Sequence, residues 1–315
     1  MLTIRNLSHD PFYNQAFEEY IYQTFPDDDI FFLWQNSPAV VVGSYQNICR
    51  EVHVEALRRL GIPVVRRMTG GGTVFHDLGN VNYTYIVRTD GGWNYDDVLA
   101  PVIAALNAIG APARKNRVCD IAIGDLKISG SAQRIVKGRL LHHGTLLFSS
   151  DLSVLDQITT HRKNDCFQSR GTQSAICTVT NIREHLTSPM TIEKFQDRLL
   201  GQMVPPGSPH LTLTAEQEAE VCRLRDEKYR SWEWTWGRTP AFTYEKSGIF
   251  NGVPIRVAYQ AKRGIVSDAV IDCAAIDGAL AAQLLSGARL DPEGFAEVCR
   301  RLAGNASNEL MDWLM

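Results

Sequence analysis

The segment from Val118 to Phe148 constrains the fold most, because it reads as three successive strands joined by very short turns. The apolar runs VCDIAI, LKISGSAQRIV and RLLHHGTLLF are separated only by Gly124-Asp125 and Lys137-Gly138. Such short connections join antiparallel neighbours, since a parallel crossover needs a dozen or more residues. At least part of the chain must therefore form an antiparallel sheet.

Further strands and helices are predicted on both sides of this segment. Runs of β-branched and aromatic residues predict strands at 30–34, 39–43, 63–67 and 81–87, the first two as a pair across the turn residues 35–38. Helical periodicity and end signals predict helices at 14–24 with Asn14 as cap, at 51–60 with Gly61 after its end, and at 96–109 with Gly110 after its end. Residues 149–181 are polar and irregular, which is typical of a functional or mobile loop.

The last third of the chain has a different organisation. Helices are predicted near 191–203 and 214–230, followed by a tryptophan-rich stretch at 232–236, a strand meander at 241–271 and three short helical patterns. We place a boundary near Glu245, which gives a larger domain at 1–245 and a small α+β domain at 246–315. The predicted class is α/β (α+β) with a mixed, largely antiparallel sheet.

Composition excludes several classes of protein. The formal charge is −3, and no block of Lys or Arg indicates binding to nucleic acid or to a membrane surface. The N-terminus lacks a charged region followed by an apolar run, and no stretch has the roughly 18 apolar residues that span a bilayer, so we expect a cytoplasmic protein. The seven cysteines are scattered without a CxxC pair, which favours reduced thiols over a zinc or redox site.

The most informative motif is the stretch Arg66-Arg67-Met68-Thr69-Gly70-Gly71-Gly72-Thr73-Val74-Phe75-His76-Asp77. Three glycines let a backbone approach a ligand closely, and their N–H groups can converge on phosphate or carboxylate oxygens. An adjacent arginine supplies donors that match phosphate. Most GGG stretches are simple turns, but the flanking arginines and the position between strands favour an anion-binding loop.

A lysine and a histidine pair follow this loop in the chain. Lys127 lies between Leu126 and Ile128, so on a strand it points to the opposite face, and the small residues 129–132 after it, which include Ala132, favour close approach of a ligand. An isolated strand lysine would more often be a solvated surface residue. His142 and His143 must face opposite ways, so at most one shares a face with Lys127. A zinc site at the histidines is disfavoured, because no cysteine or acid stands at ligand spacing beside them.

With these residues in view, the chain resembles lipoate–protein ligase A over nearly its whole length. The matching stretches, in chain order, are NQAFEEYI at 14–21, LWQNSPAVVVGSYQN at 33–47, RRMTGGGTVFHDLGNVNYT at 66–84, KISGSAQR at 127–134, HHGTLLFSSDL at 142–152, TVTNI at 178–182 and WEWTWGRTPAF at 232–242. The resemblance implies a sheet of the type found in biotin ligases and class II synthetases, with a C-terminal accessory domain. It also implies activation of lipoate or octanoate by ATP and transfer from lipoyl-AMP to a lysine of an acceptor, namely the lipoyl domains of 2-oxoacid dehydrogenase E2 subunits and the glycine-cleavage H protein. A monomer is the expected form.

The resemblance also implies a role for individual residues. Lys127 is expected to be catalytic and to contact both the carboxylate and the adenylate phosphate. The ATP and adenylate site is expected to comprise, besides Lys127, Arg67, Gly70, Gly71, Gly72, Thr73, Val74 and Phe75. The lipoate site is expected to be a largely apolar tunnel formed, besides Gly72 and Lys127, by Glu18, Trp34, Gly43, His76, Ala132 and His143.

Two positions depart from the family pattern. Asp120 is implied as a ligand of Mg²⁺ at the phosphates, but Cys119 stands where the family has Asn. The segment Ala175-Ile176-Cys177-Thr178 lacks the arginines that family members often carry before VTN. Charge compensation around the adenylate is therefore expected to differ.

Three alternatives remain open. An ATP-independent octanoyl or lipoyl transferase of the same fold uses a cysteine nucleophile, for which Cys166 and Cys177 are candidates, although neither stands at the expected spacing. A biotin ligase matches the loop and lysine motifs less well. A non-catalytic binding protein would not be expected to keep Arg67, the glycine loop and Lys127 together.

Overall fold

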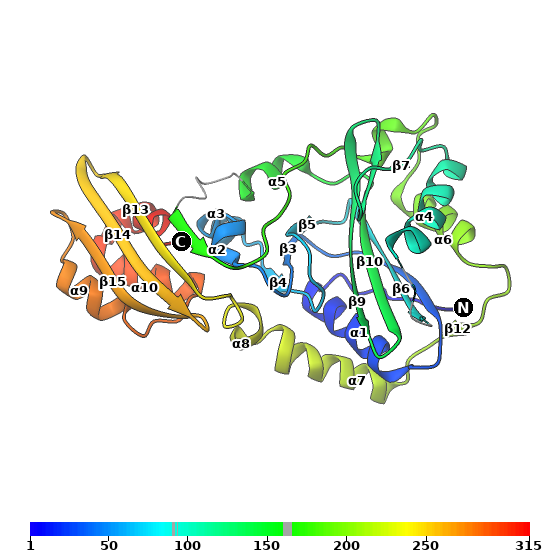
Figure 1. Ribbon diagram of the computed structural model, residues 1–315, viewed down its shortest axis with the longest axis horizontal. Helices are drawn as coiled ribbons and strands as arrows, with labels where there is room; N and C mark the ends of the chain where they lie inside the picture. Colours follow the sequence, from blue (N-terminus) through cyan, green and yellow to red (C-terminus); the bar gives the residue numbers. More distant parts are fainter. Residues whose placement is uncertain (90–91, 93, 160–165) are drawn as a thin grey trace.

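The largest element is a mixed sheet of eight strands in a computed structural model that describes residues 1–89, 92, 94–159 and 166–315 (Figure 1). β1 pairs in parallel with β2 and β12, and every other pair in this sheet is antiparallel. In spatial order the strands are β12 (His210–Leu211), β1 (Leu2–Ile4), β2 (Ile30–Trp34), β6 (Asn80–Arg88), β10 (Arg139–Leu147), β9 (Leu126–Val136), β8 (Asp120–Ile123) and β7 (Arg114–Lys115). The meander β8–β9–β10 and its two turns are confirmed, and Gly124, Lys137 and Gly138 take the positive φ angles that tight turns need.

Helices cover both faces of this sheet (Figure 1). One face packs its tyrosines Tyr83 and Tyr85 against α4 (Tyr95–Ile109) and α6 (Ile192–Met203). The other face packs Phe32 and Trp34 against α1 (Pro11–Thr24), beside which α7 (Ala215–Leu224) runs on into a π-helical turn (Arg225–Tyr229). The period of two in strands thus sends alternate side chains of β2 and β6 to two different cores.

A second, three-stranded sheet contains β3 (Ala39–Val42), β4 (Val64–Arg66) and β5 (Val74–His76). The predicted pairing of 30–34 with 39–43 is therefore wrong: β3 pairs in parallel with β4 and antiparallel with β5. Tertiary hydrogen bonds redirect the connection at 35–38, because the Asn14 amide donates to the Gln35 carbonyl at 2.8 Å and to Asn36 Oδ1 at 2.8 Å. Asn14 is consequently a buried anchor, and the helix cap is Asp10.

The predicted helix at 51–60 is divided in two. α2 (Ile48–Glu51) ends at Val52, and α3 (Val54–Leu60) begins after His53, whose ring nitrogen caps the backbone N–H of Ala56 at 3.1 Å. The predicted end is confirmed, since Gly61 has a φ of 65°.

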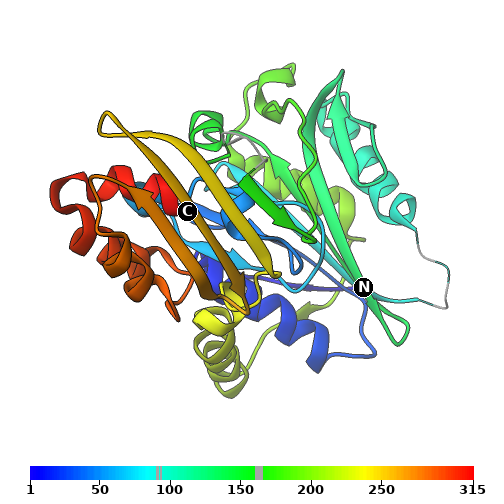
Figure 2. The ribbon, with the colours of Figure 1, turned by 60° about the vertical axis from the view of Figure 1, so that its left-hand side comes forward.

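A four-stranded antiparallel sheet lies at the C-terminal end of the molecule, to the left in Figure 1. Its strands are β13 (Phe242–Phe250), β14 (Val253–Lys262), β15 (Ile265–Cys273) and, at the edge, β11 (Phe167–Ser169). Three helices pack on it, α9 (Gly278–Leu285), α10 (Pro292–Ala303) with the short turn Gly304–Ala306, and α11 (Ser307–Leu314). The proposed boundary residue Glu245 lies within β13, and β11 comes from the first 245 residues, so the second sheet recruits a strand from the larger part (Figure 2).

The segment 149–181 is more ordered than predicted where the structure describes it. It contains α5 (Leu152–Ile158) and β11, and the turn Ile182–His185 follows, while residues 160–165 lie outside the described part. The tryptophan-rich stretch forms the short helix α8 (Trp232–Thr235). In the described residues, no helix has the length and apolar character needed to cross a membrane.

Candidate active site

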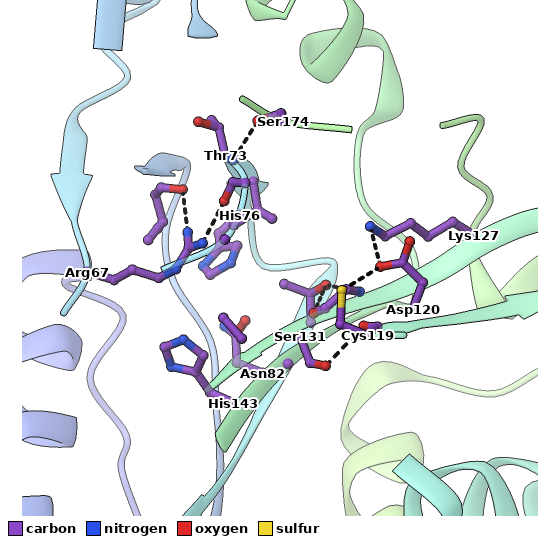
Figure 3. Close-up of a pocket in the computed structure, with 18 of the residues that line it drawn as sticks. Arg67, Thr73, His76, Asn82, Cys119, Asp120, Lys127, Ser131, His143 and Ser174 are labelled. Atoms are coloured by element: carbon purple, nitrogen blue, oxygen red, sulfur yellow. Dashed lines mark hydrogen bonds and ion pairs between the residues drawn. The ribbon is translucent and has the colours of Figure 1, made fainter. Parts of the chain in front are cut away.

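One pocket gathers most of the predicted site residues (Figure 3). It lies between the eight-stranded sheet and the glycine-rich loop that connects β4 to β5. Among its lining residues are the predicted Trp34, Arg67, Gly71, Gly72, Thr73, Val74, His76, Asp120, Lys127, Ala132 and His143.

The strand register explains how distant residues meet on the floor of this pocket. Trp34 on β2 lies opposite Asn82 on β6, and Asn82 lies opposite Thr145 on β10. In the next row, Thr84 lies opposite His143, and His143 lies opposite Ala132 on β9. His142 points to the other face, where its ring meets those of Tyr83 and Tyr95, so the expectation that only one histidine faces the ligand is confirmed.

Lys127 lies at one end of the pocket and pairs with Asp120. The distance from Lys127 Nζ to Asp120 Oδ1 is 2.8 Å. A β-bulge on β9 skips Ile128 in the register with β8, and bulges of this kind re-aim neighbouring side chains. Gly130 makes room for the ammonium group, because a Cβ at that position would stand 2.9 Å from Lys127 Nζ.

Arg67 is buried under the glycine-rich loop and holds it from below. Its guanidinium donates to the carbonyls of Gly70 at 2.6 Å, Gly72 at 2.7 Å and Val41 at 3.1 Å, and its Nε donates to Thr69 Oγ1 at 3.0 Å. Burial lowers the pKa of Arg67 to about 10, so the group stays charged at neutral pH. Arg67 thus fixes the loop with most of its donors.

A hydrogen-bond chain connects Arg67 to a buried carboxylate. Thr69 Oγ1 lies 2.8 Å from His143 Nε2, and His143 Nδ1 lies 2.8 Å from Glu18 Oε2. Glu18 Oε1 also accepts from Thr84 Oγ1 at 2.7 Å, and Thr84 accepts from Trp34 Nε1 at 2.9 Å. The Glu18 carboxylate therefore orients two side chains that line the pocket, His143 directly and Trp34 through Thr84.

Four predicted residues do not line the pocket. Glu18 is fully buried behind His143, and Phe75 packs in the core shared with the C-terminal helices. Gly43 lies beneath the loop, where a Cβ would stand 2.3 Å from the Gly71 carbonyl oxygen. Gly70 contributes its carbonyl to Arg67.

The segment after β11 covers the glycine-rich loop. Ser174 Oγ accepts from the backbone N–H of Thr73 at 2.8 Å and from Gln46 Nε2 at 3.1 Å, and it donates to the Glu51 carboxylate. Burial raises the pKa of Glu51, while the bonds from Ser174 lower it. The backbone N–H of Thr73, one of the donors of the glycine-rich loop, is thus already hydrogen-bonded to a side chain of the protein.

Eleven residues of the lining were not predicted as site residues, namely Gln15, Val41, Asn82, Arg117, Cys119, Gly130, Ser131, Gly144, Thr145, Ser174 and Ala175. A signal existed for Asn82, because Asn80, Asn82 and Thr84 place polar residues at every second position of a strand that is buried on both faces. Arg117 and Ser174 lie outside the strands, and no periodic pattern marks them.

The residues fit a magnesium ion only together with a nucleotide. Within the described ranges, no group of three or more His, Cys, Asp and Glu side chains could hold a metal ion. Among the described residues, Asp120 is the one carboxylate in the lining, and Mg²⁺ is usually held by one or two carboxylates plus phosphate oxygens.

Comparison with known proteins agrees with this geometry. Residues 10–204 match the family model of the lipoyl protein ligase A/B catalytic domain. Lipoate–protein ligase 1 of Staphylococcus aureus is 35% identical over 268 residues, which cover 83% of this chain and 81% of the relative.

Two solved structures share the fold. P. falciparum LipL1, solved in complex with lipoate, covers 99% of this chain and 98% of its own, with a TM-score of 0.64 and 21% identity. A lipoate–protein ligase A bound with ATP covers 74% of this chain and 97% of its own, with a TM-score of 0.63 and 24% identity. The match of the family model over more than half of the chain, together with the identity to a ligase over most of it, shows that the chain belongs to the lipoate–protein ligase family.

Proposed function

We propose that the chain is an ATP-dependent lipoate–protein ligase that activates lipoate or octanoate as an acyl-adenylate and transfers the acyl group to a lysine of a lipoyl domain. The observation that carries this proposal is the position of Lys127. Its ammonium lies over Gly130 and beside Asp120, at one end of the pocket that the glycine-rich loop and the row of Thr145, Asn82 and Trp34 also line. A cation in this position can bind both a carboxylate and a phosphate.

The first reaction joins two anions. A carboxylate oxygen of the acid attacks the α-phosphorus of ATP, the bond from that phosphorus to the bridging oxygen breaks, and pyrophosphate leaves. Lys127 offsets the repulsion between the reactants and stabilises the charge of the transition state. We propose that the N–H groups of Gly72 and Thr73 bind phosphate oxygens, the latter once Ser174 has left it, and that Arg67 keeps their loop in shape. Asp120 would hold Mg²⁺, which neutralises charge on the phosphates when bound.

The second reaction transfers the acyl group. The neutral amine of an acceptor lysine attacks the acyl carbonyl carbon, the bond to the phosphate oxygen breaks, AMP leaves with that oxygen, and the nitrogen releases one proton to solvent. The relative from Staphylococcus aureus is named a lipoate–protein ligase, and this name implies that the acceptor is a protein. We propose the lipoyl domains of E2 subunits and the H protein as acceptors, and a monomer as the working form.

The cysteine-dependent transferase is less compatible with the pocket. In the described part of the lining the one cysteine is Cys119, and burial, reinforced by the neighbouring Asp120, raises its pKa. A nucleophilic cysteine needs a lowered pKa, because the thiolate is the reactive form. Cys166 and Cys177, the earlier candidates, do not line this pocket.

The proposal is tested by pyrophosphate release from ATP and lipoate, followed by mass analysis of a lipoyl domain. We predict that Lys127→Ala lowers the rate of pyrophosphate release at least about a hundredfold, since removal of one electrostatic stabiliser has this effect. The melting temperature should stay within a few degrees, because the side chain is partly exposed. Lys115→Ala is the matched control, as Lys115 lies on the nearby edge strand β7 and pairs with Asp96 outside the pocket. Near-normal pyrophosphate release by Lys127→Ala would refute the assigned role, and ATP-independent acylation of a cysteine would select the transferase.

A further inference from the structure

The pocket contains three buried polar atoms that have no hydrogen-bond partner among the described residues. They are His76 Nε2, Asn82 Nδ2 and Gln15 Oε1, and the three residues are exposed by 3%, 2% and 1% respectively. Buried polar groups are nearly always paired, because a lone one costs about 1–3 kcal/mol. A pocket whose wall holds several such atoms is therefore suited to a ligand that can pair with them.

The hydrogen bonds around His76 and Asn82 show that both present donors. Asn36 Oδ1 accepts from Asn14, so its Nδ2 is the atom that donates to His76 Nδ1 at 2.9 Å. The proton of the neutral His76 ring is then on Nε2. Burial lowers the pKa of His76 to about 3, so the ring stays neutral at physiological pH. Asn82 Oδ1 accepts from Asn80 Nδ2 at 3.0 Å, which leaves the Asn82 NH2 group as the unpaired donor.

These donors lie away from the end of the pocket that holds Lys127. Asn82 is on β6, which β10 separates from β9, so it lies two interstrand spacings, about 10 Å, from the strand of Lys127. The His76 ring meets the Trp34 ring edge-on at 6.0 Å between centroids, and Trp34 is one strand farther along the sheet. Figure 3 shows Lys127 and Asp120 at one end, and His76 and His143 at the other. An acid bound to Lys127 through its carboxylate would place its tail among these donors.

We propose that His76 and Asn82 form a hydrogen-bonding subsite for the tail of the acyl chain, which selects chains with an acceptor near the tail over plain alkyl chains of the same length. The dithiolane sulfurs of lipoate are weak acceptors, and a ketone oxygen is a stronger one. An alkyl tail leaves both donors buried and unpaired, and sites of this kind reject the analogue that lacks the polar group. The inference rests on the proposed function for the direction in which the acid lies.

The test is calorimetric binding of lipoic, octanoic and 6-oxooctanoic acid without ATP. The last two have the same chain length and differ by one acceptor. The wild-type protein is expected to bind lipoic and 6-oxooctanoic acid at least about tenfold more tightly than octanoic acid. Asn82→Leu and His76→Phe should each reduce this ratio toward one, by weakening the binding of the acids that carry acceptors.

Thr145→Val is the matched control, since Thr145 lies in the row of Asn82 and lines the pocket, but its hydroxyl is already paired with Gly130. This variant should keep the ratio, whatever its effect on overall affinity. Equal affinities of the wild-type protein for all three acids would overturn the subsite. Bound water that already satisfies the donors would give the same result and overturns the subsite in the same way. This comparison uses only the wild-type protein, so it does not depend on the folding of a variant. A preference for acceptor-bearing acids without any pyrophosphate release from ATP would instead overturn the proposed function and leave the subsite in place.

Discussion

Glu18 acts on the pocket through other residues, because its carboxylate accepts from Thr84 and His143 while it is itself fully buried. The donor and the acceptor of each hydrogen bond in this chain can be assigned without conflict. Arg67 Nε donates to Thr69, the Thr69 hydroxyl donates to His143 Nε2, and His143 Nδ1–H donates to Glu18. The tautomer of His143 therefore follows from the acceptor-only character of the carboxylate.

We predict that Glu18→Gln raises the KM for the acyl acid about five- to tenfold and lowers stability by about 1–3 kcal/mol. A glutamine has one acceptor oxygen, so its NH2 group must face a donor that the carboxylate satisfied. The measurement is steady-state pyrophosphate release together with urea unfolding.

Glu19→Gln provides the matched control for this change. Glu19 is the buried neighbour on α1, but Tyr229 and Lys228 pair with it outside the pocket. It should lose stability and keep the KM of the parent. If both variants shift the KM equally, Glu18 has only a structural role.

Two buried histidines predict how stability changes with pH. Burial lowers the pKa of His76 and of His142 to about 3, from an ordinary value of 6.5. The unfolded chain therefore binds more protons than the folded one between these values, and stability is complete above pH 6.5 and is lost as the pH falls toward 3. Each histidine should contribute up to about 1.4 kcal/mol per pH unit in this range.

Urea unfolding at pH 7.5 and 5.5 measures this effect. The variant His142→Gln distinguishes the contribution of a histidine to this loss of stability from the contribution of the carboxylates. His142 is chosen because it lies on the face of the sheet away from the pocket. Its loss of stability on acidification should be smaller than that of the parent by about 1 kcal/mol. An identical loss in parent and variant would contradict the contribution of His142.

At the residue scale, the sequence predicted those roles that depend on alternation along a strand. Alternation correctly predicted that only one of His142 and His143 shares the ligand face with Lys127. It could not predict which one, because the β-bulge at Ile128 changes the alternation between Ala132 and Lys127. The roles of Arg66 and Arg67 could not be separated in this way. Both side chains are buried and donate to backbone carbonyls, and those of Gly43 and Thr235 accept from Arg66. Which carbonyls each arginine meets depends on the path of the loops around β4, and distant contacts determine that path.

At the scale of elements, the glycines differ in what a methyl group would meet. The Cβ of an alanine at 130 would stand 2.9 Å from Lys127 Nζ, which is the mobile end of a long side chain. At 43, it would stand 2.3 Å from the Gly71 carbonyl oxygen, which belongs to the backbone of the loop. The first contact can be relieved by moving the lysine, whereas the second requires the loop to shift.

We predict that Gly130→Ala keeps the melting temperature of the parent and lowers pyrophosphate release about ten- to hundredfold, because the lysine leaves its place beside Asp120. Gly43→Ala should lower both activity and melting temperature. Differential scanning calorimetry and the pyrophosphate assay check the pair. Full activity of Gly130→Ala would show that the position of the ammonium beside Asp120 is not needed.

The elements themselves were predictable where local chemistry decides. The β8–β9–β10 meander and the ends of α3 and α4 follow from turn residues and capping glycines. The pairing of β2 and β3 was wrongly predicted, because Asn14, far away in the sequence, diverts the connection between them. β5 was not predicted at all, since its three residues follow the glycines directly and depend on pairing with β3.

At the scale of the whole molecule, one segment connects the candidate active site with the C-terminal sheet. β11 pairs with β13 through residues 167–169, and five residues later Ser174 occupies the backbone N–H of Thr73. Phosphate oxygens that bind to this N–H must displace Ser174. Because the segment is anchored on β13, its displacement acts directly on the C-terminal sheet.

A continuous apolar core opposes free movement of the two parts. It includes Val40 and Phe75 near the loop, Leu57 on α3, and Phe295 and Leu310 on the C-terminal helices. A large apolar contact favours one arrangement of domains until a ligand changes the balance. The boundary near Glu245 remains a prediction. We place the hinge at 237–244, a segment that ends within the first residues of β13 that pair with β14.

The last prediction is that adenylate formation separates β11 from β13 and that this step is needed for transfer. The acceptor lysine must reach an acyl carbonyl that the segment around Ser174 covers, so the segment has to move after activation. A disulfide between Gln168→Cys and Thr243→Cys, which are opposite each other on the two strands, would prevent the separation. In a Cys166→Ser background, the oxidised protein should release pyrophosphate once per active site and transfer the acyl group at least about tenfold more slowly, while the reduced protein serves as its own control. Solution scattering should show a change in the radius of gyration with lipoyl-AMP only for the reduced form. Full transfer by the oxidised protein, with an unchanged radius in both forms, would mean that the C-terminal part is fixed and that the acceptor reaches the adenylate by another path.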